Sequence, residues 1–167
     1  MMDQKKIQEL ISRSQQEDAA AFSLLVSTFQ PLVFRLAFRL LCDEDEAKDM
    51  VQETFVKVWL ALGKYNGECR FSTWIYKITC NTCYDRLRSL YHSPLDNEAD
   101  YSVSVNISSD DNVELAVVNK QLRELILRYT DELSPRQRLI FTLRDIEELD
   151  VPEVQTITGL SAGIIKT

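Results

Sequence analysis

The sequence predicts an all-α protein made of two small helical domains joined by a flexible acidic linker. Hydrophobic residues make up 45% of the 167 residues, with only 4 Gly and 4 Pro, which is typical of a packed helical chain. Long segments on either side of residues 91–112 repeat apolar residues at helical spacing. Residues 91–112 carry five acidic residues and no Lys or Arg, which indicates a linker. We therefore expect domains at 1–90 and 113–167.

The first domain is expected to be a four-helix bundle. Residues 18–41 form one continuous apolar stripe, so they predict a long buried helix with a bend at Pro31. Asp43 followed by Glu46 predicts a capping box at the start of a second long helix, and Gly63 is expected to end it in the left-handed conformation. A loop at 64–70 then leads into a third helix at 71–90. A short first helix at 5–12 completes the bundle.

The second domain is expected to contain a helix-turn-helix. A helix at 113–130 precedes Ser134, which with Gln137 forms a second predicted capping box. Asp150 and Glu153 repeat this pattern, and a turn containing Gly leads to a last helix at Ser161. Only seven residues, 161–167, remain for that helix. In this motif the last helix reads bases, so we expect it to be cut short.

Charge and composition restrict the functions that remain. The formal net charge of −7 argues against uniform nonspecific binding to nucleic acid. Residues 1–90, however, balance 12 basic against 12 acidic side chains, whereas residues 91–167 have 7 against 14. The apolar runs are far shorter than the roughly 20 residues that span a bilayer, and the N-terminus lacks a signal-peptide core. We expect a cytoplasmic protein.

The second helix predicts an acidic surface. Residues 43–53 include six carboxylates and one Lys. Five residues share a face turned away from the apolar stripe: Asp45, Asp49, Gln52, Glu53 and Val56. This pattern fits either a solvated face favoured by the helix dipole or a docking surface for a basic partner.

The third helix and the loop before it are basic and aromatic. Residues 70–90 hold four basic side chains and one acidic, and Lys77, Asn81, Tyr84 and Arg88 follow one helix face. Cations and rings together suit single-stranded nucleic acid, and the preceding loop suits the capture of an extruded base. The alternative is structural, because residues 71, 74, 75 and 78 have the spacing of a buried helix face.

The cysteines and the remaining chemistry point away from catalysis. Cys80 and Cys83 lie inside a predicted helix, and the chain has one His, so we interpret them, with Cys42 and Cys69, as structural thiols. No metal, disulfide or other cofactor is expected. No nucleophile paired with a base and no phosphate-binding Gly loop is present, so an enzyme is not expected.

Two stretches carry a resemblance to a known family. Residues 46–59, 65–67 and 71–78, ending in Asn81, closely resemble the second region of bacterial sigma factors of the extracytoplasmic-function (ECF) group. Residues 133–167 look like the fourth region of the same family. The resemblance implies a sigma factor that directs core RNA polymerase to specific promoters and nucleates DNA melting.

The resemblance also implies roles for particular residues. It places the polymerase clamp coiled coil on the acidic face defined above. The implied contacts to the minus-ten element, including a flipped nontemplate base, are Lys64, Tyr65, Asn66, Gly67, Arg70, Ser72, Thr73, Trp74, Tyr76, Lys77, Asn81 and Arg88. The implied contacts to the minus-thirty-five element are Ser161, Ala162, Gly163, Lys166 and Thr167. The acidic linker would run toward the RNA path. Expected partners are core polymerase, through its clamp and flap, promoter DNA and an anti-sigma factor anchored in a membrane or soluble.

One residue departs from the family pattern, and two other functions remain open. Gln155 stands where the family has a small Ala, so the packing of the helix-turn-helix is in question. The first alternative is a helix-turn-helix regulator that binds duplex DNA, but this function gives no role to residues 64–88. The second is an adaptor that binds only protein, which would bind polymerase without supporting DNA-dependent transcription.

Overall fold

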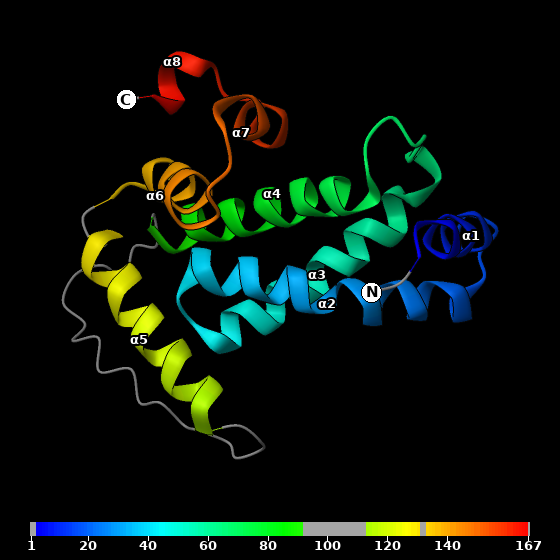
Figure 1. Ribbon diagram of the computed structural model, residues 1–167, viewed down its shortest axis with the longest axis horizontal. Helices are drawn as coiled ribbons and strands as arrows, with labels where there is room; N and C mark the ends of the chain where they lie inside the picture. Colours follow the sequence, from blue (N-terminus) through cyan, green and yellow to red (C-terminus); the bar gives the residue numbers. More distant parts are fainter. Residues whose placement is uncertain (1–2, 92–112, 131–132, 167) are drawn as a thin grey trace.

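The computed structural model describes residues 3–91, 113–130 and 133–166, and all regular structure in these ranges is helical (Figure 1). The predicted all-α class is confirmed. The elements are α1 (Gln4–Ser14), α2 (Ala19–Leu41), α3 (Glu44–Ala61), η1 (Leu62–Lys64), α4 (Phe71–Tyr91), α5 (Val113–Thr130), α6 (Pro135–Phe141), η2 (Thr142–Ile146), α7 (Val151–Thr158) and α8 (Ala162–Ile165). Apart from Tyr91, which ends α4, the predicted linker lies outside the described residues.

Helices α1 to α4 form the expected bundle, with α2 packed against the other three. The α2 helix begins at Asp18, whose side chain accepts a hydrogen bond from the Ala21 backbone N–H at 3.0 Å. One core lies within these four helices, the η1 turn and Tyr65 directly after it, and we call it the N-terminal cluster. Its buried members are Leu10, Ile11, Ala21, Leu25, Phe29, Val33, Val51, Phe55, Val58, Leu62, Tyr65, Phe71 and Ile75.

By length and composition α2 is the one helix, within the described ranges, that passes as a membrane span. Its apolar composition is explained by packing, since Leu25, Val33 and Leu36 are almost fully buried at the centre of the bundle. We therefore interpret α2 as a core helix.

Two local predictions for α3 were wrong. Gly63 does not take the left-handed conformation, because α3 tightens into the 3₁₀ turn η1 and the first positive φ comes later, at Gly67 (80°). Asp43 does accept from the Glu46 N–H at 2.9 Å, but the Glu46 carboxylate binds Arg86 of α4 instead of completing a capping box. A bidentate bond to a guanidinium is stronger than a single bond to a backbone amide.

The C-terminal helices follow the predicted caps. Both capping boxes form, at Ser134 with Gln137 and at Asp150 with Glu153. A π-helical turn, η2, continues α6, and the short helices α7 and α8 meet at Gly159, whose φ of 72° is left-handed. Figure 1 shows α6 and α7 beside α4, on the side away from α3, and α5 at the end of the bundle opposite α1. Ile126 and Thr130 of α5 are buried.

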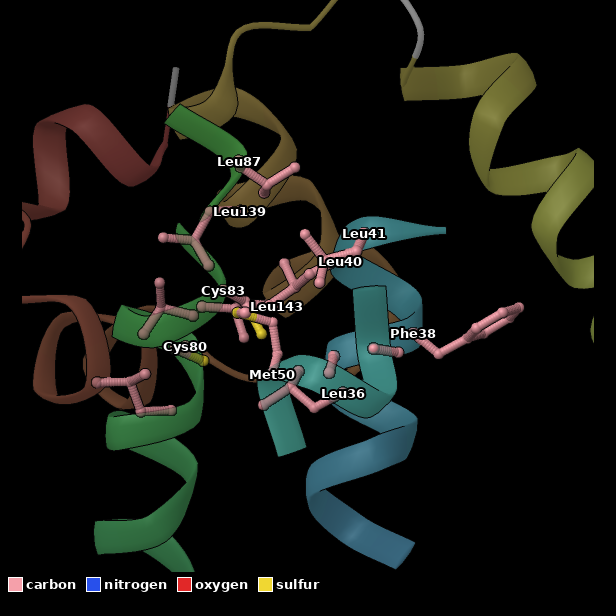
Figure 2. Close-up of a cluster of buried hydrophobic side chains, with 14 of the residues drawn as sticks. Leu36, Phe38, Leu40, Leu41, Met50, Cys80, Cys83, Leu87, Leu139 and Leu143 are labelled. Atoms are coloured by element: carbon pink, nitrogen blue, oxygen red, sulfur yellow. The ribbon is translucent and has the colours of Figure 1, made fainter. Parts of the chain in front are cut away.

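The second core is shared between the bundle and the C-terminal helices, and we call it the shared cluster. Leu139, Leu143, Val154, Ile157 and Ile165 supply its C-terminal half. The bundle supplies Leu36, Ala37, Phe38, Leu40, Leu41, Ala47, Met50, Cys80, Cys83 and Leu87 (Figure 2). The C-terminal helices therefore bury their apolar faces against α2 and α4.

Candidate functional site

The acidic surface of α3 is exposed to solvent. Asp45, Asp49, Gln52 and Glu53 are all exposed, and Val56 retains 57% of its accessible surface. The opposite side of the helix is buried in the bundle. Glu53 pairs with Lys57 at 2.8 Å, whereas neither Asp45 nor Asp49 has an ion-pair partner among the residues that the structure describes. The face therefore presents exposed carboxylates, two of them outside any ion pair in the described ranges.

Arg86 holds this helix against α4. Its Nε and Nη2 atoms donate to the two carboxylate oxygens of Glu46, both at 2.6 Å. The hydrogen bond to Glu46 raises the pKa of Arg86, so the guanidinium stays charged. The contact turns one carboxylate of the acidic segment inward and fixes the orientation of the exposed face.

An apolar groove lies beside the acidic face, between α2 and α3. Phe22 packs edge-on against Trp59 at 4.7 Å, and Leu60 is 75% exposed. The lining residues are Phe22, Val26, Gln30, Val51, Gln52, Phe55, Val56, Trp59 and Leu60. A groove of this kind next to carboxylates suits a partner helix that is apolar on one side and basic on the other.

The loop of residues 65–70 has a defined shape. The Tyr65 hydroxyl donates to the Cys69 carbonyl at 2.6 Å, and its ring packs 5.2 Å from both Phe71 and Trp74. The Asn66 side chain accepts from the Glu68 N–H at 3.2 Å, and Gly67 supplies the positive φ that the turn needs. Tyr65 is only 9% exposed, and burial raises its pKa. Its ring therefore supports the loop from inside.

The tip of the loop and one side of α4 face solvent. Lys64, Asn66, Gly67 and Arg70 of the loop and Lys77, Asn81 and Arg88 of α4 are exposed. The Arg88 guanidinium lies 5.8 Å from the centre of the half-buried Tyr84 ring. Of the four residues with core spacing, Phe71 and Ile75 are buried, and Trp74 and Ile78 are partly buried. The exposed polar and cationic side chains of α4 therefore lie apart from its buried apolar side chains.

The C-terminal helices cover part of the α4 surface. Ser72, Thr73 and Tyr76 are half-buried and line a groove with residues of α7 and the segment before it. The other lining residues are Leu32, Leu149, Asp150, Pro152, Glu153, Thr156 and Ile157. These α4 residues therefore face carboxylates of the same chain.

An ion pair fastens this contact. Arg39 of α2 donates to Glu147, with the two side chains 23% and 10% exposed. Burial, reinforced by the neighbouring Glu147, raises the pKa of the Tyr76 hydroxyl. Sequence patterns did not reveal this pairing, because 108 residues separate its partners.

The helix-turn-helix presents its last residues to solvent. Ser161, Gly163 and Lys166 are exposed and Ala162 is half-buried, while Thr167 lies outside the described residues. Ser161 takes an extended conformation before α8 without a hydrogen bond from its side chain to the cap. Gln155 is half-buried, and its carbonyl accepts from the Gly159 N–H at 2.8 Å while Val154 and Ile157 fill the core. The turn closes with Gln155 in place of a small residue.

The buried cysteines behave as packing residues. Burial raises the pKa of the Cys80 thiol, and it raises that of Cys83 to about 12. Cys42 is also buried, and Cys69 is exposed in the loop. In the part of the chain that the structure describes, no cluster of acidic, His and Cys side chains is able to hold a metal ion.

Comparison with known proteins identifies the class. Residues 25–92 match the family described as Sigma-70 region 2, and residues 123–167 match Sigma-70, region 4. The chain is therefore a sigma-70-type sigma factor of bacterial RNA polymerase. The region 4 match runs through residue 167, so it does not support the expectation that the last helix is cut short.

Full-length relatives narrow the group. The chain is 30% identical to the ECF RNA polymerase sigma-E factors of Escherichia coli K12 and Salmonella typhimurium, and 28% identical to the RNA polymerase sigma-H factor of Pseudomonas aeruginosa. Each alignment covers 100% of this chain and 90% of the relative. The protein belongs to the ECF sigma factors, which direct RNA polymerase to specific promoters to begin transcription and are not enzymes.

A solved structure supports the fold. The chain resembles CnrH, whose structure is known in complex with the cytosolic domain of CnrY, with a TM-score of 0.62 and 21% identity. The similarity covers 98% of this chain and 88% of that one. It therefore extends over both the bundle and the C-terminal helices.

Proposed function

We propose that this sigma factor attaches to RNA polymerase through the acidic α3 face and opens promoters with the loop and α4. The observation that carries the proposal is that both surfaces are exposed on one rigid bundle, joined by the Arg86–Glu46 contact. Attachment to polymerase then fixes where the loop reaches DNA. We divide the chain as expected, into 1–90, a linker at 91–112, and 113–167.

Polymerase docking is assigned to Asp45, Asp49, Gln52, Glu53 and Val56. The exposed carboxylates of this set attract a basic partner, and the adjacent apolar groove supplies area that such a partner helix buries. The clamp coiled coil of polymerase is the proposed occupant. The flap is the proposed partner of the region 4 helices.

Promoter opening is assigned to the exposed loop tip and the exposed face of α4. Lys64, Arg70, Lys77 and Arg88 provide phosphate contacts, and the amides of Asn66 and Asn81 read base edges. Tyr65 and Trp74 support the loop from below, since their rings pack against each other and against Phe71. Ser72, Thr73 and Tyr76 line the part of the site that faces α7.

Region 4 is proposed to read the minus-thirty-five element through Ser161, Ala162, Gly163, Lys166 and Thr167. The helix-turn-helix places the start of its last helix in the major groove of duplex DNA. Lys166 is the charged member of this set and supplies phosphate contact.

Regulation is proposed to come from an anti-sigma factor, either soluble or anchored in a membrane, that binds this chain in the cytoplasm. CnrH forms a complex with the cytosolic domain of CnrY, which supports a partner of this kind. Such a partner would compete with polymerase for the same surfaces.

Reversing one exposed charge tests the docking assignment. Asp49→Lys should weaken binding to core polymerase at least about 10-fold, because it places like charge opposite a basic partner. Helix content measured by circular dichroism should not change, since the Asp49 side chain is exposed. Glu9→Lys, on the exposed side of α1, is the matched control and should bind as wild type. Equal binding by all three proteins would reject the assignment.

A second variant separates DNA capture from docking. Asn81→Ala should slow promoter opening more than it weakens polymerase binding, because Asn81 faces solvent on α4. Holoenzyme should also prefer a forked minus-ten fragment with exposed nontemplate bases over duplex of the same sequence. A protein that binds polymerase without supporting transcription would instead be an adaptor.

A further inference from the structure

We propose that Gln15, at the end of α1, is a positioning residue that holds the strand-capturing loop of residues 65–70 in place. The inference rests on the proposed function of that loop. Gln15 lies outside the matched region 2 segment, which begins at residue 25. It is separated from the loop by about fifty residues, so no local pattern points to it.

The side-chain amide of Gln15 joins α1 to the end of α3. Its Nε2 atom donates to the Leu62 carbonyl at 3.0 Å and to the Tyr65 carbonyl at 2.9 Å. An amide nitrogen carries two hydrogens, so these contacts use its full donor capacity. They bracket the η1 turn, because Leu62 begins the turn and Tyr65 directly follows it.

These contacts hold the η1 turn and the first residue of the loop against the end of α1. The Leu62 carbonyl already accepts from the Tyr65 backbone N–H at 3.1 Å, and Gln15 gives it a second donor. Gln15 also donates to the Tyr65 carbonyl, at the point where the chain leaves the turn. The loop's own bonds, from Tyr65 to Cys69 and from Glu68 to Asn66, fix its internal shape, and the buried Tyr65 ring packs its first residue against α4. Gln15 is the polar contact that ties the first residue of the loop to α1.

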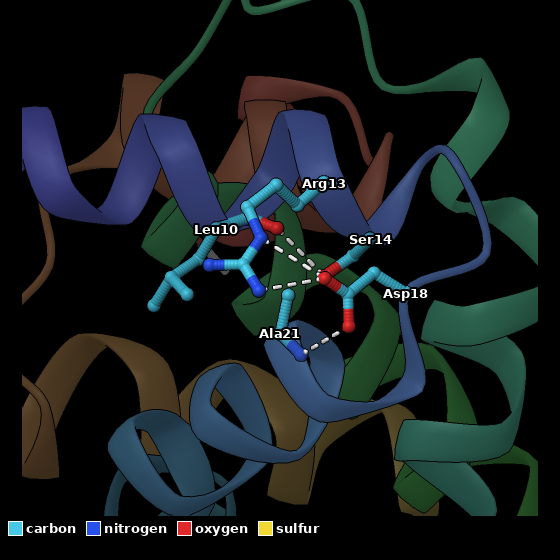
Figure 3. A network of polar contacts seen from close by, with 5 residues as sticks. All are labelled: Leu10, Arg13, Ser14, Asp18 and Ala21. Carbon is cyan, nitrogen blue, oxygen red and sulfur yellow. Dashed lines mark hydrogen bonds and ion pairs between the residues drawn. The ribbon is translucent and has the colours of Figure 1, made fainter.

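Gln15 is itself held by contacts that do not depend on it. The Arg13 guanidinium donates to Asp18 at 2.9 and 2.7 Å, and the Ser14 hydroxyl donates to the Leu10 carbonyl at 2.7 Å (Figure 3). Leu10 and Ile11 bury α1 against the bundle. The corner between α1 and α2 therefore survives loss of the Gln15 side chain, and only the support of the loop is lost.

When the loop is already held in position, it loses less conformational entropy on binding a DNA strand. An unpositioned loop must lose conformational freedom when it binds, which weakens binding without removing any contact to the ligand. The ligand is a single strand with an unstacked base. The effect of Gln15 should thus appear in strand capture and promoter opening and not in attachment to polymerase.

The test compares Gln15→Ala with Gln16→Ala in the complete protein. Gln16 is the adjacent exposed Gln, and no side-chain hydrogen bond of Gln16 is seen in the described part of the chain. With core polymerase and a forked minus-ten oligonucleotide, Gln15→Ala should lower DNA affinity and the opening rate about 10-fold, from two neutral hydrogen bonds. Affinity for core polymerase should match that of Gln16→Ala. Gln15→Glu, which keeps the shape but presents oxygen to the two carbonyls, should be worse.

Hydrogen exchange without DNA gives an independent readout. Amides of residues 65–70 should exchange faster in Gln15→Ala than in Gln16→Ala, while those of α2 are unchanged. Equal exchange, or equal opening by the two variants, overturns the proposal, as does a parallel loss of core binding. If wild-type holoenzyme shows no preference for forked DNA, the proposed function itself fails. That result is visible without any Gln15 variant.

Discussion

The two apolar clusters of this protein are built differently. The N-terminal cluster draws all its side chains from α1 to α4 and the turn between them, whereas the shared cluster joins α2, α3 and α4 to α6, η2, α7 and α8. The bundle is therefore complete without the C-terminal helices in one of its cores and depends on them in the other. The region 4 helices therefore have a hydrophobic core that is completed by side chains of the bundle.

Breaking the N-terminal cluster should have the largest effect. Leu25→Ala removes a side chain that is 1% exposed, and we expect the free energy of unfolding to fall by about 3 kcal/mol through lost burial and a residual cavity. Urea denaturation followed by Trp fluorescence measures this, since Trp59 and Trp74 both lie in the bundle. Leu24→Ala, at a position 50% exposed, should change stability by less than about 0.5 kcal/mol.

Breaking the shared cluster should release the C-terminal helices and leave the bundle folded. Leu143→Ala should lower the free energy needed to release the C-terminal helices by about 2 kcal/mol. In a Cys69→Ser background, a thiol reagent should then label Cys80 roughly 30-fold faster. Cys80 lies near Glu147 of η2's end, whereas Cys83 lies near Glu53 and Lys57 of α3, so Cys83 should change less. Ile164→Ala, at an exposed position of α8, is the control. Equal acceleration at both cysteines would mean that the bundle opens as well.

The ion pair between Arg39 and Glu147 should contribute the smallest of these effects. Removing either charge, in Arg39→Met or Glu147→Gln, leaves a largely buried partner without its counter-charge. We expect each substitution to weaken the contact between the C-terminal helices and the bundle by about 1 kcal/mol, a value reduced for the partial exposure of the pair. Cys80 labelling in a double-mutant cycle measures the coupling, and strictly additive effects would contradict a direct pair.

The sequence predicted features that depend on neighbours along the chain. The helices, both C-terminal capping boxes and the turn at Gly159 all arise from local spacing, and they formed where expected. The acidic face of α3 is exposed for the same reason, because periodicity alone separates it from the buried side of the helix.

Features that depend on distant partners were missed or misassigned. Glu46 had the right spacing for a capping box, but Arg86, 40 residues away, takes its carboxylate. Apolar residues such as Leu139 and Leu143 marked a buried face without identifying what covers it. Gln15 belongs to no motif, since its partners are two backbone carbonyls, which no side-chain pattern reveals. The contacts to polymerase and DNA remain predictions.

The shared cluster has a mechanical consequence for the proposed mode of action. Promoter elements centred at minus ten and minus thirty-five are separated by about 25 base pairs, or roughly 85 Å of duplex. Helices packed directly on α4 are unable to span that distance, so simultaneous contact with both elements requires Leu143 and its neighbours to leave Cys80 and Leu87. The free energy needed to expose these apolar surfaces reduces the net affinity for the promoter. In the proposed function, contacts between the released helices and polymerase would offset this cost.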